Sequence, residues 1–276
     1  MNLAKMEESR RMNAWGRLKG FVNLEDRQYE HFLRKYEARG WKQLMFYLLL
    51  ALLPGVLTYI LIYHLREPLM ELTGLSSHNM QFIILALMAS GWHILFPLAM
   101  LRYADKLTFK ESLRYLGFAR LDLKGLLVVF PALVILFTLI SLPYMKYVFP
   151  PLSGWLDSLP FFHMGEWHIW RLGYYDFPWY LLVIGLIGNF IGEEIYFRGY
   201  LLRKVGSLKL DWLVIAILFQ IYHMWQAPQN WAFIPLAPFI PEEIWIKLRK
   251  NIYGSILFHV FINFVWGWIT VQLVGV

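Results

Sequence analysis

The sequence contains no cysteine among its 276 residues, and only 16% of its residues are charged. The absence of cysteine excludes disulfide bonds and thiolate metal sites. The shortage of charge is more informative, because an ordinary soluble domain is about one quarter charged. Hydrophobic residues instead make up 58% of the chain, and aromatic residues make up 18%. This composition is typical of a protein that lies in a membrane.

Long apolar runs recur along the chain, and six of them predict transmembrane helices. About 20 apolar residues are needed to cross the hydrocarbon core of a bilayer. The six runs cover residues 43–65, 80–101, 125–149, 179–202, 211–226 and 251–274. A further apolar segment, 230–250, contains three prolines and two adjacent glutamates, a pattern that fits a short bent span or a re-entrant segment. We therefore expect an all-α, polytopic transmembrane helical bundle over residues 43–276.

Residues 1–42 are polar and basic, with ten Lys or Arg against six Asp or Glu. The run EDRQYEHFLRKYEARG within them predicts an amphipathic helix, in solvent or on the membrane surface. Lys and Arg also outnumber acids in residues 102–124 and 203–211, whereas acids outnumber bases in 66–78 and 146–178. Because cytoplasmic loops are enriched in Lys and Arg, we expect a multi-pass protein of the cell inner or plasma membrane with a cytoplasmic N-terminus.

The formal net charge of +7 does not require a nucleic-acid partner. Retention of basic residues in cytoplasmic loops accounts for it in a membrane protein. The expected partners are therefore the lipid bilayer and a substrate within it, with no nucleic acid.

Three charged residues interrupt the fourth predicted span, in the stretch GNFIGEEIYFRGYLL of residues 188–202. A charge at the centre of a span costs at least ~2.5 kcal/mol on insertion scales, so each such group needs a partner or a function. Residues four apart on a helix share a face, while adjacent residues point about 100° apart. Glu194 and Arg198 are therefore predicted to form an ion pair, and Glu193 to face the interior of the bundle. The alternative is a purely structural ion pair between helices.

The next predicted spans add polar side chains at a similar depth. His223 follows Phe219 by four residues in the fifth span, and His259 precedes Asn263 by four residues in the last. A single histidine in such a helix is more often structural, but titratable groups that converge in an apolar pocket indicate a functional site. We therefore predict that the two histidines and Asn263 meet Glu193.

These residue types suit the hydrolysis of a bond by an activated water. A buried carboxylate can act as a general base, so Glu193 would take a proton from a water that His223 helps to orient. His259 and Asn263 would donate hydrogen bonds to the oxyanion that forms from the scissile carbonyl. Arg198 would hold its helical neighbour Glu194 and keep the end of the helix in register.

The ordered set of motifs resembles a known protease family. The motifs are E-E-x-x-x-R at Glu193, Glu194 and Arg198, F-x-x-x-H at Phe219 and His223, and H-x-x-x-N at His259 and Asn263. Together they resemble the CAAX protease and bacteriocin-processing (CPBP, also called ABI) family of intramembrane endopeptidases over residues 179–274. The resemblance implies that Glu193 and His223 activate the water, that His259 and Asn263 lie on the oxyanion side, and that Glu194 and Arg198 support them. We expect the substrate to be a membrane-embedded peptide or protein.

The residues by themselves leave the cofactor open. Glu193, His223 and His259 could hold Zn²⁺, as in some catalytic zinc sites. The H-E-x-x-H pairing of zinc proteases is absent from the sequence, however, and the family resemblance implies catalysis by glutamate without an obligatory metal. We therefore expect no cofactor, with zinc as the alternative.

Two functions other than proteolysis stay open at this point. The chain could be a non-catalytic membrane scaffold or an immunity-type protein that retains the fold. It could also be a proton-coupled transporter, since glutamate and histidine in spans also build proton relays. The lack of an internal repeat between residues 43–149 and 179–274 counts against transport.

Several other polar or small residues carry lesser expectations. Asn189 lies one turn before Glu193 and is predicted to help hold it. The spacing of three glycines in the fourth span predicts close approach of another helix. They are Gly185, Gly188 and Gly192. His93 is predicted to be structural.

Two connecting segments have open roles. Glu242 and Glu243 either reshape substrate access or lie at the membrane interface. The connection 150–178, with His163 and His168, is expected to lie on the interface, the alternative being a cap over the site.

Overall fold

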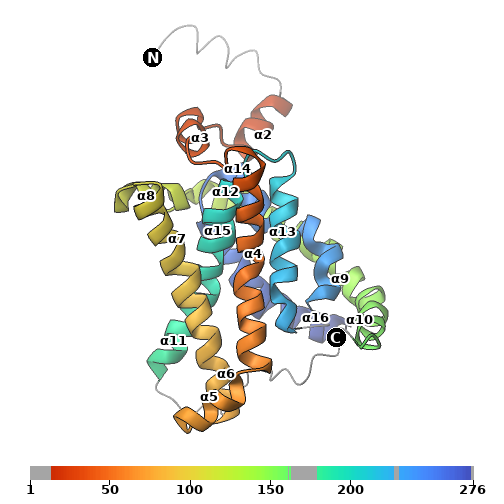
Figure 1. Cartoon of the computed structure of the whole chain (residues 1–276). Coiled ribbons are helices and arrows are strands. Elements are labelled where there is room, and N and C mark those ends of the chain that lie inside the picture. Colours follow the sequence, from red (N-terminus) through yellow and green to blue (C-terminus); the bar gives the residue numbers. More distant parts are fainter. Residues whose placement is uncertain (1–13, 161, 163–178, 227–229, 275–276) are drawn as a thin grey trace, which may run out of the picture.

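The computed structural model describes residues 14–160, 162, 179–226 and 230–274. These residues form helices and no strands, arranged as a bundle, which confirms the all-α prediction (Figure 1). The predicted connection around His163 and His168 lies outside the described residues. Short helices cover the ends of the bundle. They are α2 (Ala14–Val22), α3 (Arg27–Arg34), α5 (Arg66–Thr73), α8 (Phe109–Leu116) and α10 (Phe149–Asp157).

Five helices in the described part of the chain are long and apolar enough to cross a membrane. They cover Gly40–Tyr63, Ser77–Ala104, Gly125–Tyr147, Trp179–Lys204 and Tyr253–Val274. Their elements are α4 (Gly40–Tyr63), α6 (Ser77–Ala86), η1 (Leu87–Leu95), α7 (Phe96–Ala99), η2 (Met100–Ala104), η3 (Gly125–Val129), α9 (Phe130–Tyr147), α11 (Trp179–Ile187), η4 (Gly188–Gly192), η5 (Glu194–Leu201), α12 (Leu202–Lys204), α15 (Tyr253–Val260), η8 (Phe261–Trp266) and α16 (Gly267–Val274). The chain is therefore a multi-pass membrane protein.

The predicted span at 211–226 is shorter than expected. Its α-helix, α13, covers only Asp211–Tyr222 and continues as a 3₁₀ turn, η6, over His223–Gln226. At ~1.5 Å per residue α13 is ~18 Å long, less than the ~30 Å hydrocarbon core. The helix changes its hydrogen bonding at His223, which is one of the residues that line a cavity.

The proline-containing apolar segment 230–250 is bent. A 3₁₀ helix, η7, covers Trp231–Phe239, and the α-helix α14 covers Pro241–Arg249. Between them Ile240 adopts an extended conformation with ψ 126°. Pro241 occupies the first turn of α14, where its missing N–H is tolerated. Both helices are far shorter than a transmembrane helix, so the prolines divide this segment in the way that the sequence suggested.

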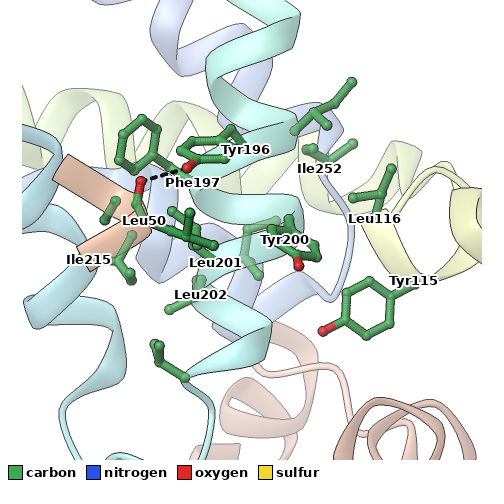
Figure 2. Close-up of a cluster of buried hydrophobic side chains, with 14 of the residues drawn as sticks. Leu50, Tyr115, Leu116, Tyr196, Phe197, Tyr200, Leu201, Leu202, Ile215 and Ile252 are labelled. Atoms are coloured by element: carbon green, nitrogen blue, oxygen red, sulfur yellow. Dashed lines mark hydrogen bonds between the residues drawn. The ribbon is translucent and has the colours of Figure 1, made fainter. Parts of the chain in front are cut away.

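The C-terminal half of the fourth span lies at the centre of the bundle. Its side chains pack against residues from α4, α8 and α13, including Leu50, Tyr115 and Ile215 (Figure 2). The Tyr196 hydroxyl donates a hydrogen bond of 2.6 Å to the Leu50 carbonyl oxygen. Every residue from Glu194 to Leu201 is buried, so the charges of the E-E-x-x-x-R motif are held inside protein rather than against lipid.

The fourth span also departs from regular α-helical geometry. Its middle, η4 and η5, is π-helical, and the Glu193 N–H donates to the Gly188 carbonyl five residues earlier. Single π turns in helices are frequent at functional sites. A Cβ atom on Gly188 or Gly192 would collide with Ser90 or Ala89 of η1, and one on Gly185 would collide with Phe82 of α6. The predicted close helix approach at the three glycines is therefore confirmed.

Candidate active site

A cavity of about 360 Å³ lies between the fourth span, the end of α13, η7 and the last span. Its ionisable lining residues are Glu193, His223, Glu242 and His259. Amide side chains also line it, from Asn189, Gln220, Gln226, Asn230 and Asn263. Aromatic rings supply much of the remaining wall, from Phe137, Phe219, Trp225, Phe233 and Trp266. In the described part of the chain no lysine or arginine lines this cavity, so its ionisable groups are carboxyls and imidazoles.

The cavity brings together residues from three separate motifs. Glu193 comes from the junction of η4 and η5, and His223 from the start of η6. His259 lies in α15 and Asn263 in η8. All four line the same cavity, together with Phe219 and Asn189. The predicted convergence of these side chains is therefore present in the structure, although their catalytic roles stay predictions.

The Glu193 carboxyl is the point toward which both histidines are directed. Its side chain is 4% exposed, and its Oε2 atom has no hydrogen-bond partner among the described residues. The Nε2 atoms of His223 and His259 each lie 3.9 Å from this Oε2. A separation of 3.9 Å exceeds a direct hydrogen bond. Polar atoms at such a separation are commonly joined by a bridging water.

Each ring is oriented by a hydrogen bond at its other nitrogen. The Nδ1 atom of His223 lies 2.8 Å from the Phe219 carbonyl oxygen. A carbonyl oxygen only accepts, so Nδ1 carries the hydrogen and Nε2 of the neutral ring is an acceptor. The Nδ1 atom of His259 lies 3.1 Å from Glu194 Oε1, which also accepts. His259 can therefore donate from Nε2 only as an imidazolium, whose charge the adjacent Glu194 carboxylate would balance.

Asn263 and Asn189 take different positions beside these groups. The Asn263 Nδ2 atom donates to the His259 carbonyl oxygen at 3.1 Å, which leaves its second amide hydrogen free for the cavity that it lines. The Asn189 Nδ2 atom lies 3.5 Å from Glu193 Oε1, at the outer limit of a hydrogen bond. Asn189 thus contacts Glu193 as predicted, but weakly.

Arg198 forms a buried ion-pair cluster behind the cavity. Its Nη1 atom lies 3.0 Å from Glu194 Oε1, the predicted helical pair, and its Nε atom lies 2.7 Å from Glu243 Oε1. All three side chains are fully buried. The guanidinium also lies 4.0 Å from the centroid of the Phe219 ring. Arg198 therefore fixes the fourth span, α13 and α14 to one another, which explains why an arginine is tolerated at this depth.

Glu242 and Glu243 were not predicted to be part of the site. Glu243 is the second carboxylate on Arg198, and the buried Glu242 lines the cavity with its Oε2 unpartnered among the described residues. The Ser255 hydroxyl donates to the Glu242 carbonyl oxygen at 2.9 Å, which fixes α14 to α15. Burial raises the pKa of the Glu242 carboxyl from 4.5 to about 8. The signal in the sequence was two adjacent glutamates in an apolar segment, without an indication of their partner.

His93 does not reach the cavity. It is fully buried against the rings of Tyr196, Phe197 and Tyr222, and it is absent from the cavity lining. This placement supports its predicted structural role.

The Glu193, His223 and His259 set does not have zinc-site geometry. Ligand atoms at ~2.0–2.1 Å from a tetrahedral zinc lie about 3.3 Å from one another. The two distances from Glu193 Oε2 to the histidine Nε2 atoms are both 3.9 Å. No group of three His, Asp or Glu side chains in the described ranges is arranged to hold a metal ion.

Comparison with known protein families finds a similarity in the C-terminal part of the chain. Residues 175–265 match the protein-family model described as type II CAAX prenyl endopeptidase Rce1-like. The matched region contains all three motifs and every ionisable residue that lines the cavity. A search of curated proteins and a search of solved structures found no significant match.

Proposed function

From the match of residues 175–265 to the Rce1-like CAAX endopeptidase model, we propose that this multi-pass membrane protein hydrolyses a peptide bond with a water activated by Glu193. The substrate would be a membrane-associated peptide or protein. The main support is one observation: a buried carboxylate oxygen, without a hydrogen-bond partner among the described residues, faces two imidazole nitrogens, each 3.9 Å away. These three atoms would hold one water between them.

The first step follows from which atoms can accept hydrogen. A water between Glu193 and His223 would donate one hydrogen to Glu193 Oε2 and the other to His223 Nε2, which leaves an oxygen lone pair for attack. As the water oxygen bonds to the scissile carbonyl carbon, its proton passes to Glu193. The peptide carbonyl becomes the oxyanion of a tetrahedral intermediate.

The second step returns that proton. The oxyanion would accept hydrogen bonds from His259 Nε2 and from the free amide hydrogen of Asn263. When the intermediate collapses, the carbon–nitrogen bond breaks and the protonated Glu193 donates to the leaving amine. The products are a new carboxyl group and a new amine. Glu194 and Arg198 would act only through His259. Glu194 accepts a hydrogen bond from His259 Nδ1, and Arg198 forms an ion pair with Glu194.

The reaction is proposed to need no metal, on the basis of the distances at Glu193. The purified protein should therefore keep its cleavage rate, within twofold, after incubation with 1,10-phenanthroline and removal of the chelator. A loss that added Zn²⁺ restores would instead assign a metal to the site.

We also propose that the end of the bundle bearing α2, α3 and α8 faces the cytoplasm. The excess of Lys and Arg in residues 1–42 and 102–124 supports this orientation. The cavity would then open to substrates of the cell inner or plasma membrane.

The decisive experiment compares membranes from cells that express the wild type or Glu193→Gln. Glutamine keeps the size and hydrogen-bonding capacity of the side chain but cannot serve as a base. New peptide N-termini are profiled together with the precursors that accumulate. Products that disappear in the variant, at an unchanged protein level, identify both the activity and the substrate.

Glu71→Gln is the matched control, because Glu71 is exposed on α5 and far in sequence from the motifs. Its cleavage profile should equal that of the wild type. If Glu193→Gln also gives the wild-type profile and rescues any phenotype, the protein is a non-catalytic scaffold and the proposal fails.

A further inference from the structure

Two further cavities are lined by residues of α3 and α14, helices that lie at the same end of the bundle. Their volumes are about 280 Å³ and about 270 Å³. Tyr29 and Lys250 line both, so the two adjoin, and we call them together the terminal hollow. None of their lining residues lines the catalytic cavity. The terminal hollow is thus a separate feature of the molecule.

Basic side chains outnumber acidic ones around the terminal hollow. The basic residues are Arg34, Arg114, Arg120, Arg203, Lys247 and Lys250, and the acidic residues are Asp26, Glu30 and Glu37. Two of the acids are already compensated, since Glu30 lies 2.9 Å from Lys250 and Asp26 lies 3.7 Å from Arg120. Burial raises the pKa of the third, Glu37, so six basic residues face three acids. The hollow therefore has surplus positive charge.

Arg203 is the most unusual of these residues, because it is a buried cation with no carboxylate at ion-pair distance in the described part of the chain. Its Nη1 atom donates to the Tyr29 hydroxyl, and its guanidinium lies near the rings of Tyr29 and Tyr115. Its Nε and Nη2 atoms have no partner among the described residues, although the residue is only 5% exposed. A buried donor that lacks an acceptor is costly, and a buried cation more so.

Arg203 lies between the two cavities of the hollow. The residue lines the first, and its Nη2 atom lies beside the position that a Cβ on Gly117 would occupy, Gly117 being part of the wall of the second. A side chain at Gly117 would therefore press on the guanidinium. An acceptor that entered from either cavity would need only a small shift of Arg203 to meet its free N–H groups.

The level of Arg203 in the bilayer indicates the kind of acceptor. It is the penultimate residue of the span Trp179–Lys204, so it lies where the chain leaves the hydrocarbon core. Lipid phosphates lie at this level, and basic pockets between helices on the cytoplasmic side bind lipid headgroups. A guanidinium also matches the geometry of phosphate oxygens. We propose that the terminal hollow binds a phosphate group, with Arg203 as its central contact and Arg34 and Lys250 beside it.

The test measures the thermal unfolding midpoint of the purified full chain in an uncharged detergent. The probes are phosphatidylglycerol, phosphatidylcholine and inorganic phosphate, each titrated separately. Phosphatidylglycerol should raise the midpoint in a saturable manner, and phosphatidylcholine, whose choline cation neutralises its phosphate, should not. If inorganic phosphate reproduces the rise, a free phosphate is sufficient; if only phosphatidylglycerol does, the source is a lipid headgroup. Equal effects of the two lipids together with no effect of phosphate would overturn the proposal.

Paired charge-matched variants separate a site from general attraction. Arg34→Gln combined with Lys250→Gln removes two cations of the hollow, and Lys110→Gln combined with Lys209→Gln removes two exposed cations that do not line it. The first pair should weaken the apparent affinity for phosphatidylglycerol at least tenfold, and the second pair less than twofold. Equal losses in both would contradict a defined site. Because neither pair touches the catalytic cavity, the outcome is independent of the proposed proteolysis.

Discussion

Two pairs of adjacent glutamates, Glu193–Glu194 and Glu242–Glu243, enter the same buried region from different helices. In each pair one carboxylate contacts Arg198, Glu194 at 3.0 Å and Glu243 at 2.7 Å. The other member of each pair lines the cavity with its Oε2 unpartnered among the described residues. Adjacent residues on a helix point about 100° apart, so this division follows from local geometry.

The two unpaired carboxyls nevertheless have different surroundings. Glu193 faces the Nε2 atoms of two histidines at 3.9 Å. Glu242 has no histidine or arginine at ion-pair distance within the described ranges. Burial is therefore common to both carboxyls, and the two imidazoles distinguish Glu193, the carboxyl that we propose to activate a water. The comparison can be tested one residue at a time.

The largest expected difference is between the two cavity glutamates in catalysis. Glu193→Gln should lower the cleavage rate by about 10²–10⁴-fold, the usual contribution of a general base. Glu242→Gln should change it by less than tenfold, since no imidazole is aimed at that carboxyl. Both are measured on the substrate that N-terminal profiling identifies, with the purified proteins at equal concentration. An equal loss in the two variants would show that Glu242 also takes part in the chemistry.

Arg198, the residue that the two pairs share, should matter most for stability. Arg198→Gln leaves two buried carboxylates without a cation, and the loss of one partner from a buried ion pair costs about 3–5 kcal/mol. The free energy of unfolding in mixed micelles measures this loss. Arg39→Gln, at an exposed position, is the control and should lie within about 0.5 kcal/mol of the wild type. A small effect at Arg198 would mean that the carboxyls are protonated in the native protein.

Replacement of Glu194 and of Glu243, the two partners of Arg198, should affect stability alike but cleavage differently. Glu194→Gln and Glu243→Gln should each cost about 1–3 kcal/mol of stability, because each weakens one charged contact. Only Glu194 also accepts from His259, at 3.1 Å. Its replacement should therefore slow cleavage about tenfold at saturating substrate, whereas Glu243→Gln should leave turnover near the wild-type value. If Glu243→Gln slows cleavage more than Glu194→Gln does, His259 does not take part in the reaction.

The smallest effect is a pH dependence of stability. The pKa of Glu242 is raised from 4.5 to about 8 because the carboxyl is buried. Between these two values the native state holds a proton that the unfolded chain has released, so the stability that this carboxyl contributes is fully present below pH 4.5 and is lost as pH rises toward about 8. Glu242→Gln should flatten this decline of the thermal midpoint between pH 5 and 8. An unchanged slope would place the titration on Glu243, whose pKa burial also raises.

Most of the architecture could be predicted from the sequence, because a long run of apolar residues is enough to indicate a membrane span. Five of the six predicted spans correspond to helices of transmembrane length. The pair Glu194–Arg198 could be predicted for a similar reason, as both residues belong to one helix. The length of α13 could not, since its end is set by the turn at His223 into the cavity.

The sequence alone determined five of the six predicted spans, the motifs and which side chains share a helical face, since these depend on neighbours along the chain. Only the tertiary structure decided that Glu243 meets Arg198, that Glu242 lines the cavity, and that two imidazoles face Glu193. These contacts join helices that are distant in sequence. Their partners depend on how the helices pack, and no local periodicity encodes that choice.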